Sequence, residues 1–219
     1  MICFLGTSHA ASHLRAAAKQ RGNWIINDPD KAHVVFVSED TPTDEHGNRD
    51  LEPILKLINR AKTTGAQLVL TSQVPPGFTR SLGIKNIFHQ AETLRIIDAE
   101  KRAYRPEYIA VGGDHRINTA YADYLASFEC PLLRMTWEEA EFSKIAVNMF
   151  LAAQVDVTNR LAAAASKVGA KWEAVAEALR SDSRIGERAY LTPGRWQDSR
   201  HLLRDAITLQ GLECTAQTT

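Results

Sequence analysis

The chain has 219 residues, of which 44% are hydrophobic and 24% are charged, and its formal net charge is zero. This composition is typical of a soluble globular protein of one large domain or two small ones, without the basic excess that nucleic acids and anionic membranes attract. No apolar run approaches the 18 residues of a membrane-spanning helix, so we expect neither a nucleic-acid partner nor a membrane partner.

The compartment follows from the N-terminus and the cysteines. The first residues, MICFLGTSHAASHL, lack the charged segment and long apolar run of a secretory signal peptide. Cys3, Cys130 and Cys214 are scattered and odd in number, which predicts free thiols in a reducing compartment. We therefore expect a cytoplasmic protein without disulfides and without a metal site.

Residues 1–135 alternate between short apolar strands and helices, which is typical of a parallel sheet covered on both faces. We expect strands at Ile2–Leu5, Trp24–Asn27, Val34–Val37, Leu68–Thr71, Tyr108–Val111 and Leu132–Met135. We expect helices from the Gly6 turn to about Gln20, at Leu51–Lys62 and at Ile117–Phe128. The fold class is therefore α/β, with a Rossmann-like doubly wound domain over residues 1–135 and a helical domain over residues 136–219.

The turn after the first strand is where a dinucleotide-binding fold carries G-x-G-x-x-G, whose glycines let the backbone approach the pyrophosphate. The three positions hold Gly6, Ser8 and Ala11. Ala is tolerated at the third position, whereas Ser at the second places a side chain where the pyrophosphate should approach. Asp28, after the second strand, either holds the ribose of the cofactor or is an ordinary turn former.

A long helix opens the second domain. Thr136 is a suitable N-cap, Glu139 completes a capping box, and Gly169 is the expected stop. About 30 residues at 1.5 Å each make a rod of roughly 45 Å. The middle of this helix is apolar on most sides and needs cover on most sides, which predicts a homodimer formed through helix 137–168.

Lys144 and Asn148 interrupt the apolar surface of that helix. They are four residues apart and therefore share one face. Two interpretations stay open from the spacing. Either a lysine snorkels beside a helix-interior asparagine, or the pair points into a site where it binds an oxygen whose charge changes during a reaction.

The segment EFSKIAVNMFLAAQVDVTNRLAAAASKVGAKWEAVAEALRSDSRIG resembles the central segment of the UDP-glucose and GDP-mannose dehydrogenases, with its K-x-x-x-N-x-F helix, V-G-A-x-x-x-x-V-A run and R-I-G. The likeness extends over almost the whole chain through AHVVFVSEDTPTDEHGNRDLEPILKLI, LVLTSQVPPGFT, HQAETLRII and RPEYIAVGGD. The resemblance implies NAD-dependent oxidation of the primary alcohol of a nucleotide sugar to a carboxylate, through a thioester on a cysteine.

The resemblance also implies roles for individual residues. Lys144 and Asn148 match the pair that stabilises oxyanions, and Glu92 and Asp205 match the glutamate of P-E-F-L-R and the aspartate closing G-G-S-C-F-P-K-D. Arg184 matches an arginine that reaches the substrate of the neighbouring subunit. On the cofactor side, Gln73 stands where the family has a threonine.

Several family features are absent from the sequence. His201 falls at the place of the nucleophilic cysteine, and the glycine loop before it has become Trp196–Arg200. We expect His201 to be either a base for the alcohol proton or an ordinary polar residue in a loop. Only Asp28–His33 joins the second and third strands, where the family has a helical excursion. The sequence stops at Thr219. We therefore also expect the family's third region, an α/β domain that binds the nucleotide of the sugar donor, to be missing.

Three functions follow as hypotheses. The first is a NAD-dependent UDP-glucose 6-dehydrogenase-like oxidoreductase that is impaired and oxidises at best an alcohol to an aldehyde. The second is a non-catalytic dimerising relative, a pseudoenzyme or interaction module. The third and weaker one is an oxidoreductase that uses the cofactor half on a smaller substrate. The altered first turn predicts that NAD binding is weakened or lost.

Overall fold

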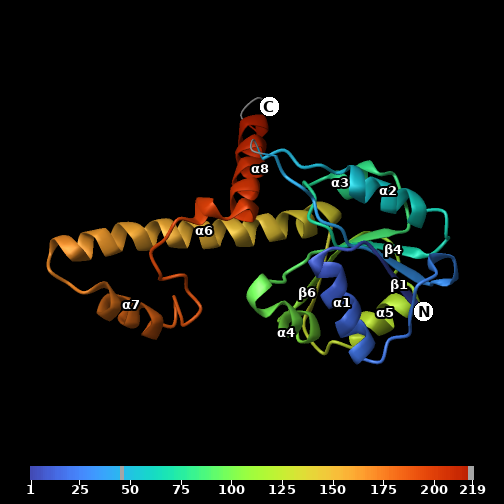
Figure 1. The fold of residues 1–219 in the computed structure, drawn as a ribbon, viewed down its shortest axis with the longest axis horizontal. Coiled ribbons are helices and arrows are strands. Elements are labelled where there is room, and N and C mark those ends of the chain that lie inside the picture. Colours follow the sequence, from blue (N-terminus) through green and yellow to red (C-terminus); the bar gives the residue numbers. More distant parts are fainter. Residues whose placement is uncertain (45–46, 217–219) are drawn as a thin grey trace. The chain divides into compact units, whose positions relative to one another are not determined.

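The structure is a computed structural model that describes residues 1–44 and 47–216. The chain divides into two compact units, one over Met1–Lys144 and one that begins at Ile145. Figure 1 shows the fold of each unit. Within the described residues, no helix combines the length and the apolar character needed to cross a membrane.

The first unit is built on a seven-stranded sheet of order β2-β1-β3-β4-β5-β6-β7. Its strands are β1 (Ile2–Leu5), β2 (Ile25–Ile26), β3 (Val34–Val37), β4 (Gln67–Leu70), β5 (Ile87–Gln90), β6 (Ile109–Gly112) and β7 (Leu132–Met135). Strands β5 and β6 pair antiparallel, whereas the other neighbours pair parallel. The sheet is therefore mostly parallel, as the alternation of strands and helices predicts.

Helices cover both faces of this sheet (Figure 1). One face packs against α1 (His9–Gln20), α4 (Ala99–Tyr104) and α5 (Thr119–Ala126). The other face packs against α2 (Glu52–Ala61), α3 (Phe78–Ser81) and the beginning of α6 (Trp137–Lys167). Short 3-10 turns lie at Pro29–Lys31 (η1) and Ile96–Asp98 (η2). The doubly wound arrangement expected from the sequence is thus confirmed.

The core of the first unit follows from its strand composition. Strands buried on both faces read as continuous apolar runs, and VVFV of β3 is buried at each position. Phe36 of β3 stacks on Phe4 with ring centroids 4.6 Å apart and meets Tyr121 edge-on. The buried Tyr121 hydroxyl donates to Oε1 of Gln90 at 3.0 Å. This bond pairs the Tyr121 hydroxyl with the side-chain oxygen of Gln90 inside the core.

The β1–α1 turn requires glycine at position 6. Gly6 has a φ of +114°, and a Cβ at this position would lie 2.0 Å from the carbonyl oxygen of Ser38. Only glycine permits this conformation and this approach of two backbones. The turn is therefore packed onto the carboxyl end of β3.

The long helix α6 begins and ends as its sequence predicts. The amide of Glu139 donates to Oγ1 of Thr136 at 3.3 Å, and the amide of Thr136 donates to Oε2 of Glu139 at 2.7 Å. These reciprocal bonds form the expected capping box. At the other end Gly169 has a φ of +73°, and the amide of Ala170 donates to the carbonyl of Ala165 at 2.9 Å. The glycine stop is therefore confirmed.

The second unit contains α6 from Ile145 onward, α7 (Trp172–Ser181), the 3-10 turn η3 (Trp196–Asp198) and α8 (Arg200–Ala216). The segment between α7 and η3 is tied to α6 by side chains. Thr158 Oγ1 donates to the carbonyl of Tyr190 at 2.8 Å, and Asn159 Nδ2 donates to the carbonyl of Gly194 at 2.7 Å. These hydrogen bonds hold the segment along the helix.

The sequence prediction missed some elements. Strand β5 was not expected, because its sequence IFHQ ends in two polar residues that are nevertheless buried. Helices α3, α4 and α8 were not expected either. The prediction of a loop around His201 is wrong, because this residue lies in the first turn of α8. Leu202 and Leu203 belong to the same helix. The sequence analysis did not predict this helix, because it aligned the segment with a glycine loop of the family.

Candidate functional site

The site residues predicted from the sequence divide between the two units. The first unit contains Gly6, Ser8, Ala11, Asp28, Gln73, Glu92 and Lys144. The second contains Asn148, Arg184, His201 and Asp205.

In the first unit, the carboxyl ends of β1 and β3 form the topological switch point. Helix α1, which follows β1, covers one face of the sheet, and α2, which follows β3, covers the other. Ligands of open α/β sheets bind in the crevice at such a point. The β1–α1 turn that begins at Gly6 lies there, as the sequence predicts.

Ser8 fastens this turn to the sheet. Its side chain is buried and caps α1, because Oγ accepts the amide of Ala11 at 3.0 Å. The same hydroxyl donates to the carbonyl of Ser38 at 3.0 Å. The Ser8 hydroxyl is therefore directed inward to the end of β3, and it consumes one of the first amides of α1.

The carboxylate of Glu39 occupies the outer side of the turn. Its Oε2 accepts the amide of Thr7 at 2.9 Å and the hydroxyl of Thr7 at 3.2 Å, and its Oε1 accepts the amide of Asp40 at 3.0 Å. Backbone amides at this turn are the groups that a dinucleotide fold offers to the pyrophosphate. Sequence reasoning missed Glu39. An acidic residue two positions after the third strand was the available signal.

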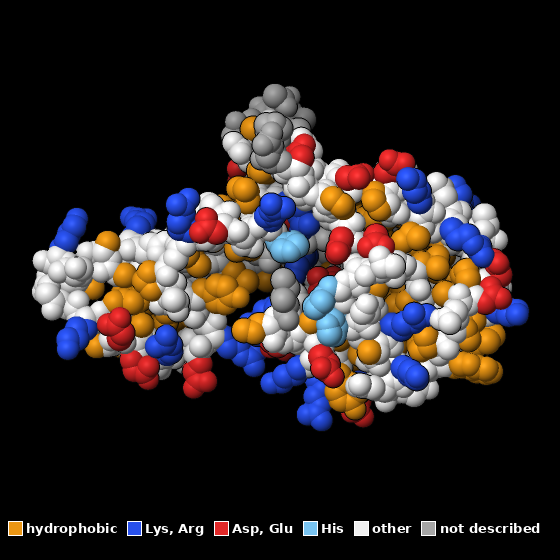
Figure 2. All heavy atoms as spheres, viewed as in Figure 1, with side chains coloured by type: hydrophobic (Ala, Val, Ile, Leu, Met, Phe, Trp, Pro, Cys, Tyr) orange, Lys and Arg blue, Asp and Glu red, His pale blue; other side chains and the backbone are white. Residues whose placement is uncertain are grey.

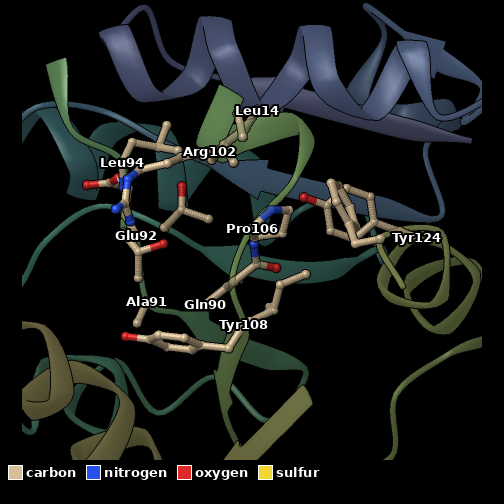
Figure 3. Close-up of a pocket in the computed structure, with 14 residues that line it drawn as sticks. Leu14, Gln90, Ala91, Glu92, Leu94, Arg102, Pro106, Tyr108 and Tyr124 are labelled. Atoms are coloured by element: carbon tan, nitrogen blue, oxygen red, sulfur yellow. The ribbon is translucent and has the colours of Figure 1, made fainter. Parts of the chain in front are cut away.

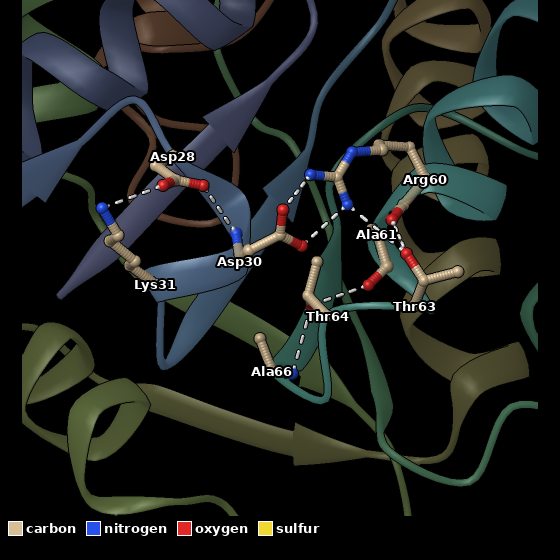
Figure 4. A network of polar contacts seen from close by, with 8 residues as sticks. All are labelled: Asp28, Asp30, Lys31, Arg60, Ala61, Thr63, Thr64 and Ala66. Carbon is tan, nitrogen blue, oxygen red and sulfur yellow. Dashed lines mark hydrogen bonds and ion pairs between the residues drawn. The ribbon is translucent and has the colours of Figure 1, made fainter.

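Asp28 lies in the short β2–β3 connection shown in Figure 4. Its Oδ1 accepts the amide of Asp30 at 3.1 Å, which caps η1, and its Oδ2 lies 3.4 Å from Nζ of Lys31. Asp30 in turn makes a two-pronged contact of 2.6 and 3.0 Å with the Arg60 guanidinium, and this hydrogen bonding lowers the pKa of Asp30. Asp28 thus acts as a turn former, and its ribose role stays a prediction.

Glu92 lies two residues after β5 and lines a small cavity with Gln90, Arg102 and Tyr108 (Figure 3). Its carboxylate accepts a hydrogen bond from the Leu94 amide. The cavity offers about 30 Å³ to solvent, which is room for about one water molecule. Ligand pockets typically have volumes of about 300–1,000 Å³, so this cavity does not serve as a ligand pocket in its present form. Gln73 lies half-buried in the loop after β4.

Glu141 anchors the beginning of α6 to the first unit. Its side chain is buried and accepts the amides of Gly77 at 2.6 Å and Thr79 at 2.8 Å, which caps α3. Burial raises the pKa of the Glu141 carboxyl. The half-buried Lys144 follows three residues later on the same helix. Sequence reasoning missed Glu141, because one carboxylate in a helix gives no sign of a distant partner.

In the second unit, the structure brings Asn148 and Asp205 together from positions far apart in the sequence. Nδ2 of Asn148 donates to Oδ2 of Asp205 at 2.6 Å, and Nε of Arg204 lies 3.2 Å from Oδ1 of Asp205. All three side chains are buried, and Asp205 is fully so. We name these three residues the buried polar cluster.

The remaining predicted residues of the second unit lie at its surface. His201 is exposed. The side chain of Arg184 is 87% exposed and lies on Asp182, with Nη2 of the arginine 2.7 Å from Oδ2 of the aspartate. The three cysteines are free thiols, as expected. Cys214 is exposed in α8, and burial raises the pKa of Cys3.

A doubly wound sheet that continues through a long helix into a helical unit defines a dehydrogenase-like fold. The structure of a UDP-glucose dehydrogenase from Pyrobaculum islandicum matches with a TM-score of 0.72 and 21% identity over 95% of this chain and 67% of that chain. The structure of a UDP-D-ManNAc dehydrogenase from Pyrococcus horikoshii matches with a TM-score of 0.74 and 16% identity over 89% of this chain and 60% of that chain.

The sequence comparisons identify a family within the proteins that share this fold. Residues 138–210 match the model of the UDP-glucose/GDP-mannose dehydrogenase family, central domain. The chain is 32% identical over 180 residues to the UDP-glucose 6-dehydrogenase of Pseudomonas aeruginosa, covering 71% of this chain and 39% of that enzyme. The protein is therefore related to the UDP-glucose/GDP-mannose dehydrogenase family. It spans less than half the length of the curated relatives it matches.

Proposed function

We propose that this chain is a non-catalytic, dimer-forming relative of the nucleotide-sugar dehydrogenases. The observation that carries the proposal is the Glu39 carboxylate on the amide and hydroxyl of Thr7, at the switch point of the sheet. A fixed negative charge there opposes the pyrophosphate of NAD. Two unit charges 4 Å apart repel by about 1 kcal/mol in bulk water and by about 4 kcal/mol near a protein surface.

The missing thiol supports the same proposal. The family's oxidation to a carboxylate passes through a thioester, and such an intermediate needs a cysteine nucleophile. In the register of the resemblance, the exposed His201 stands at that place, at the beginning of α8. An imidazole does not form a thioester, so the acyl half of the reaction has no nucleophile at that position.

The surface of α6 supports dimerisation. Val147, Phe150, Val157 and Leu161 are exposed and recur at a spacing of three, seven and four residues. This is the 3.5-residue repeat of helices that pack against a partner helix. The same helix buries Ile145, Asn148 and Ala152 in a separate stripe. Figure 2 shows hydrophobic side chains at the surface over this part of the chain. A second copy supplies a matching stripe by two-fold symmetry.

A second candidate function is NAD-dependent oxidation of a nucleotide-sugar alcohol to the aldehyde. Its support is the 2.6 Å contact between Asn148 and Asp205, with Lys144 one helical turn before Asn148. An amide and an ammonium on one helix face suit an oxygen that gains negative charge in the transition state. This step does not need the missing thiol.

Titration with NAD and NADH, followed by tryptophan fluorescence, separates the two functions. Trp24 is 71% exposed and directly precedes β2, which makes it a usable reporter. The proposed function predicts no saturable change at millimolar cofactor and no NADH production from UDP-glucose. Micromolar binding together with NADH production would instead establish the second candidate. In that case, His201→Cys tests whether a thiol at this position restores oxidation to the carboxylate.

A further inference from the structure

Two histidines share the first turns of α1. His9 and His13 are four residues apart and thus lie on one face of the helix. Their Nε2 atoms are 3.1 Å apart, and their ring centroids are 4.3 Å apart with the rings inclined by 64°. His9 is exposed and His13 is half-buried. Figure 2 shows histidine side chains gathered at the surface over the beginning of α1.

The distance between the two Nε2 atoms matches that of two nitrogens bound to the same metal ion. A Zn–N bond is about 2.0–2.1 Å long, so two nitrogens on one ion lie about 2.9 Å apart at a right angle and about 3.3 Å apart at the tetrahedral angle. The observed 3.1 Å lies between these values. The distance between the two Nε2 atoms therefore fits that of two ligands sharing one ion.

The helix turn that carries the pair is fixed in place. Ser8 caps α1 through the amide of Ala11 and is bonded to the carbonyl of Ser38. The hydroxyl of Ser12 donates to the carbonyl of Ser8 at 3.3 Å, which adds a further bond in the same turn. A turn that is held by the sheet positions its side chains more accurately than a free helix end does.

We propose that His9 and His13 form a two-histidine site for a divalent transition-metal ion of the Zn²⁺, Ni²⁺ or Cu²⁺ class. Imidazole nitrogens suit these ions, and histidines four apart on a helix provide two of their ligands in known zinc motifs. The remaining coordination positions face solvent and take water or a small anion. The positive end of the helix dipole opposes the cation only weakly, because the site is exposed.

This site departs from our expectation of no metal, which rested on the cysteine spacing. Within the part of the chain that the structure describes, no group of three or more His, Cys, Asp and Glu side chains is placed to share an ion. The site therefore has two protein ligands, fewer than the three or four of catalytic and structural zinc sites. We expect correspondingly weaker binding, with one ion per chain.

The test is calorimetric titration of the full chain with ZnCl₂ alone, after removal of any affinity tag. The wild type should bind one ion, and His9→Ala and His13→Ala should each weaken binding by about tenfold or more, because either change leaves a single ligand. His115→Ala is the matched control, because His115 is an exposed imidazole beside Asp114 Oδ1 at 3.2 Å. It should bind zinc as the wild type does.

A spectroscopic measurement addresses the same pair independently. Cu²⁺ added to the wild type should give an electron paramagnetic resonance signal with two nitrogen ligands, and His13→Ala should reduce it to one. If the 3.1 Å contact is only a hydrogen bond between the two rings, zinc binding will be absent or will be equal in the wild type and both variants. Either result overturns the proposal, and circular dichroism of each variant verifies that α1 is retained.

Discussion

The two units of the chain are stabilised in different ways. The first buries large apolar and aromatic side chains on both faces of its sheet, among them Phe36 and Tyr121 on one face and Ile54 and Leu68 on the other. From Ile145 onward, the buried apolar side chains within the described residues are one isoleucine, one leucine and three alanines. The large buried groups there are polar, namely the buried polar cluster of Asn148, Arg204 and Asp205.

This difference indicates what each unit needs. Burying a large apolar side chain contributes about 1.5–3 kcal/mol, whereas burying an alanine contributes much less. The first unit has enough such side chains to close its own core. The second unit exposes Phe150 and Val157 on α6 while it depends on hydrogen bonds inside. We infer that it gains the missing apolar burial from a partner copy.

The largest effect is expected at Asp205 in the buried polar cluster. Asp205→Ala leaves the guanidinium of Arg204, only 4% exposed, and the amide of Asn148 without this partner. Removing one member of a buried charge pair costs about 3–5 kcal/mol. The free energy of unfolding from urea denaturation should fall by this amount.

A matched substitution on an exposed pair calibrates this result. The side chain of Asp198 is 71% exposed and lies 3.6 Å from the similarly exposed Arg195. Asp198→Ala should change stability by well under 1 kcal/mol. Equal effects of the two substitutions would contradict the larger cost expected for opening the buried polar cluster.

The next effect concerns the exposed stripe of α6. Phe150 is 76% exposed, and Phe150→Glu should place a charge in the dimer interface and cost about 2 kcal/mol or more of association free energy. Light scattering after size exclusion should show a dimer for the wild type at micromolar concentration and a shift toward monomer for the variant. Ser166→Glu adds the same charge to an exposed position outside the stripe and should leave the dimer intact. A monomeric wild type would disprove the inference that the second unit gains apolar burial from a partner copy.

The third effect is a pH dependence that belongs to the first unit. His89 is buried on β5, and burial lowers its pKa from 6.5 to about 3. The unfolded chain therefore binds this proton more readily than the folded chain does. The stability is fully present above about pH 6.5 and falls as the pH decreases toward 3, by about 2 kcal/mol at pH 5.

Urea denaturation at pH 8 and pH 5 tests this sign. His89→Gln should lack this component of the loss at pH 5, whatever its effect on stability at pH 8. His115→Gln replaces an exposed histidine and should keep it. A wild type and a His89→Gln variant with parallel pH profiles would show that His89 is not the responsible group.

The smallest effect is expected at the Asp30–Arg60 pair of Figure 4. Its contacts of 2.6 and 3.0 Å are shorter than the one between Arg204 and Asp205, yet both side chains are largely exposed to water. Water screens such pairs, so Arg60→Ala should leave the denaturation midpoint within experimental error. A large shift would show that the β2–β3 connection depends on this pair more than its exposure suggests.

The sequence predicted those features of the fold that depend on residues close together in the chain. The strand runs, the capping box of Thr136 and Glu139 and the Gly169 stop each depend on residues a few positions apart, and the structure has all three. The contacts of Glu39 and Glu141 were not predictable in this way, because their partners lie 32 and 62–64 residues away. His201 was misplaced because a glycine loop of the family was assumed where this sequence forms a helix.

The contacts of the candidate site were likewise only partly predictable from the sequence. The resemblance placed Asn148 and Asp205 in one site, and the structure joins them at 2.6 Å. Spacing alone did not indicate that Arg204 would take the other oxygen of the same carboxylate. Arg204 stands at the lysine that precedes the aspartate in the G-G-S-C-F-P-K-D pattern, a position to which the sequence analysis gave no role, and the fold shows that this residue is buried.

The most direct test of the central claim, that Glu39 closes the dinucleotide crevice, is to compare NAD affinity among three proteins. Glu39→Gln removes the charge on the Thr7 amide, while Asp40→Asn removes a neighbouring exposed charge. We predict that Glu39→Gln binds NAD about tenfold tighter or more than the wild type, which corresponds to about 1.4 kcal/mol, and that Asp40→Asn does not. Micromolar NAD binding by the wild type, unchanged in Glu39→Gln, would contradict the claim.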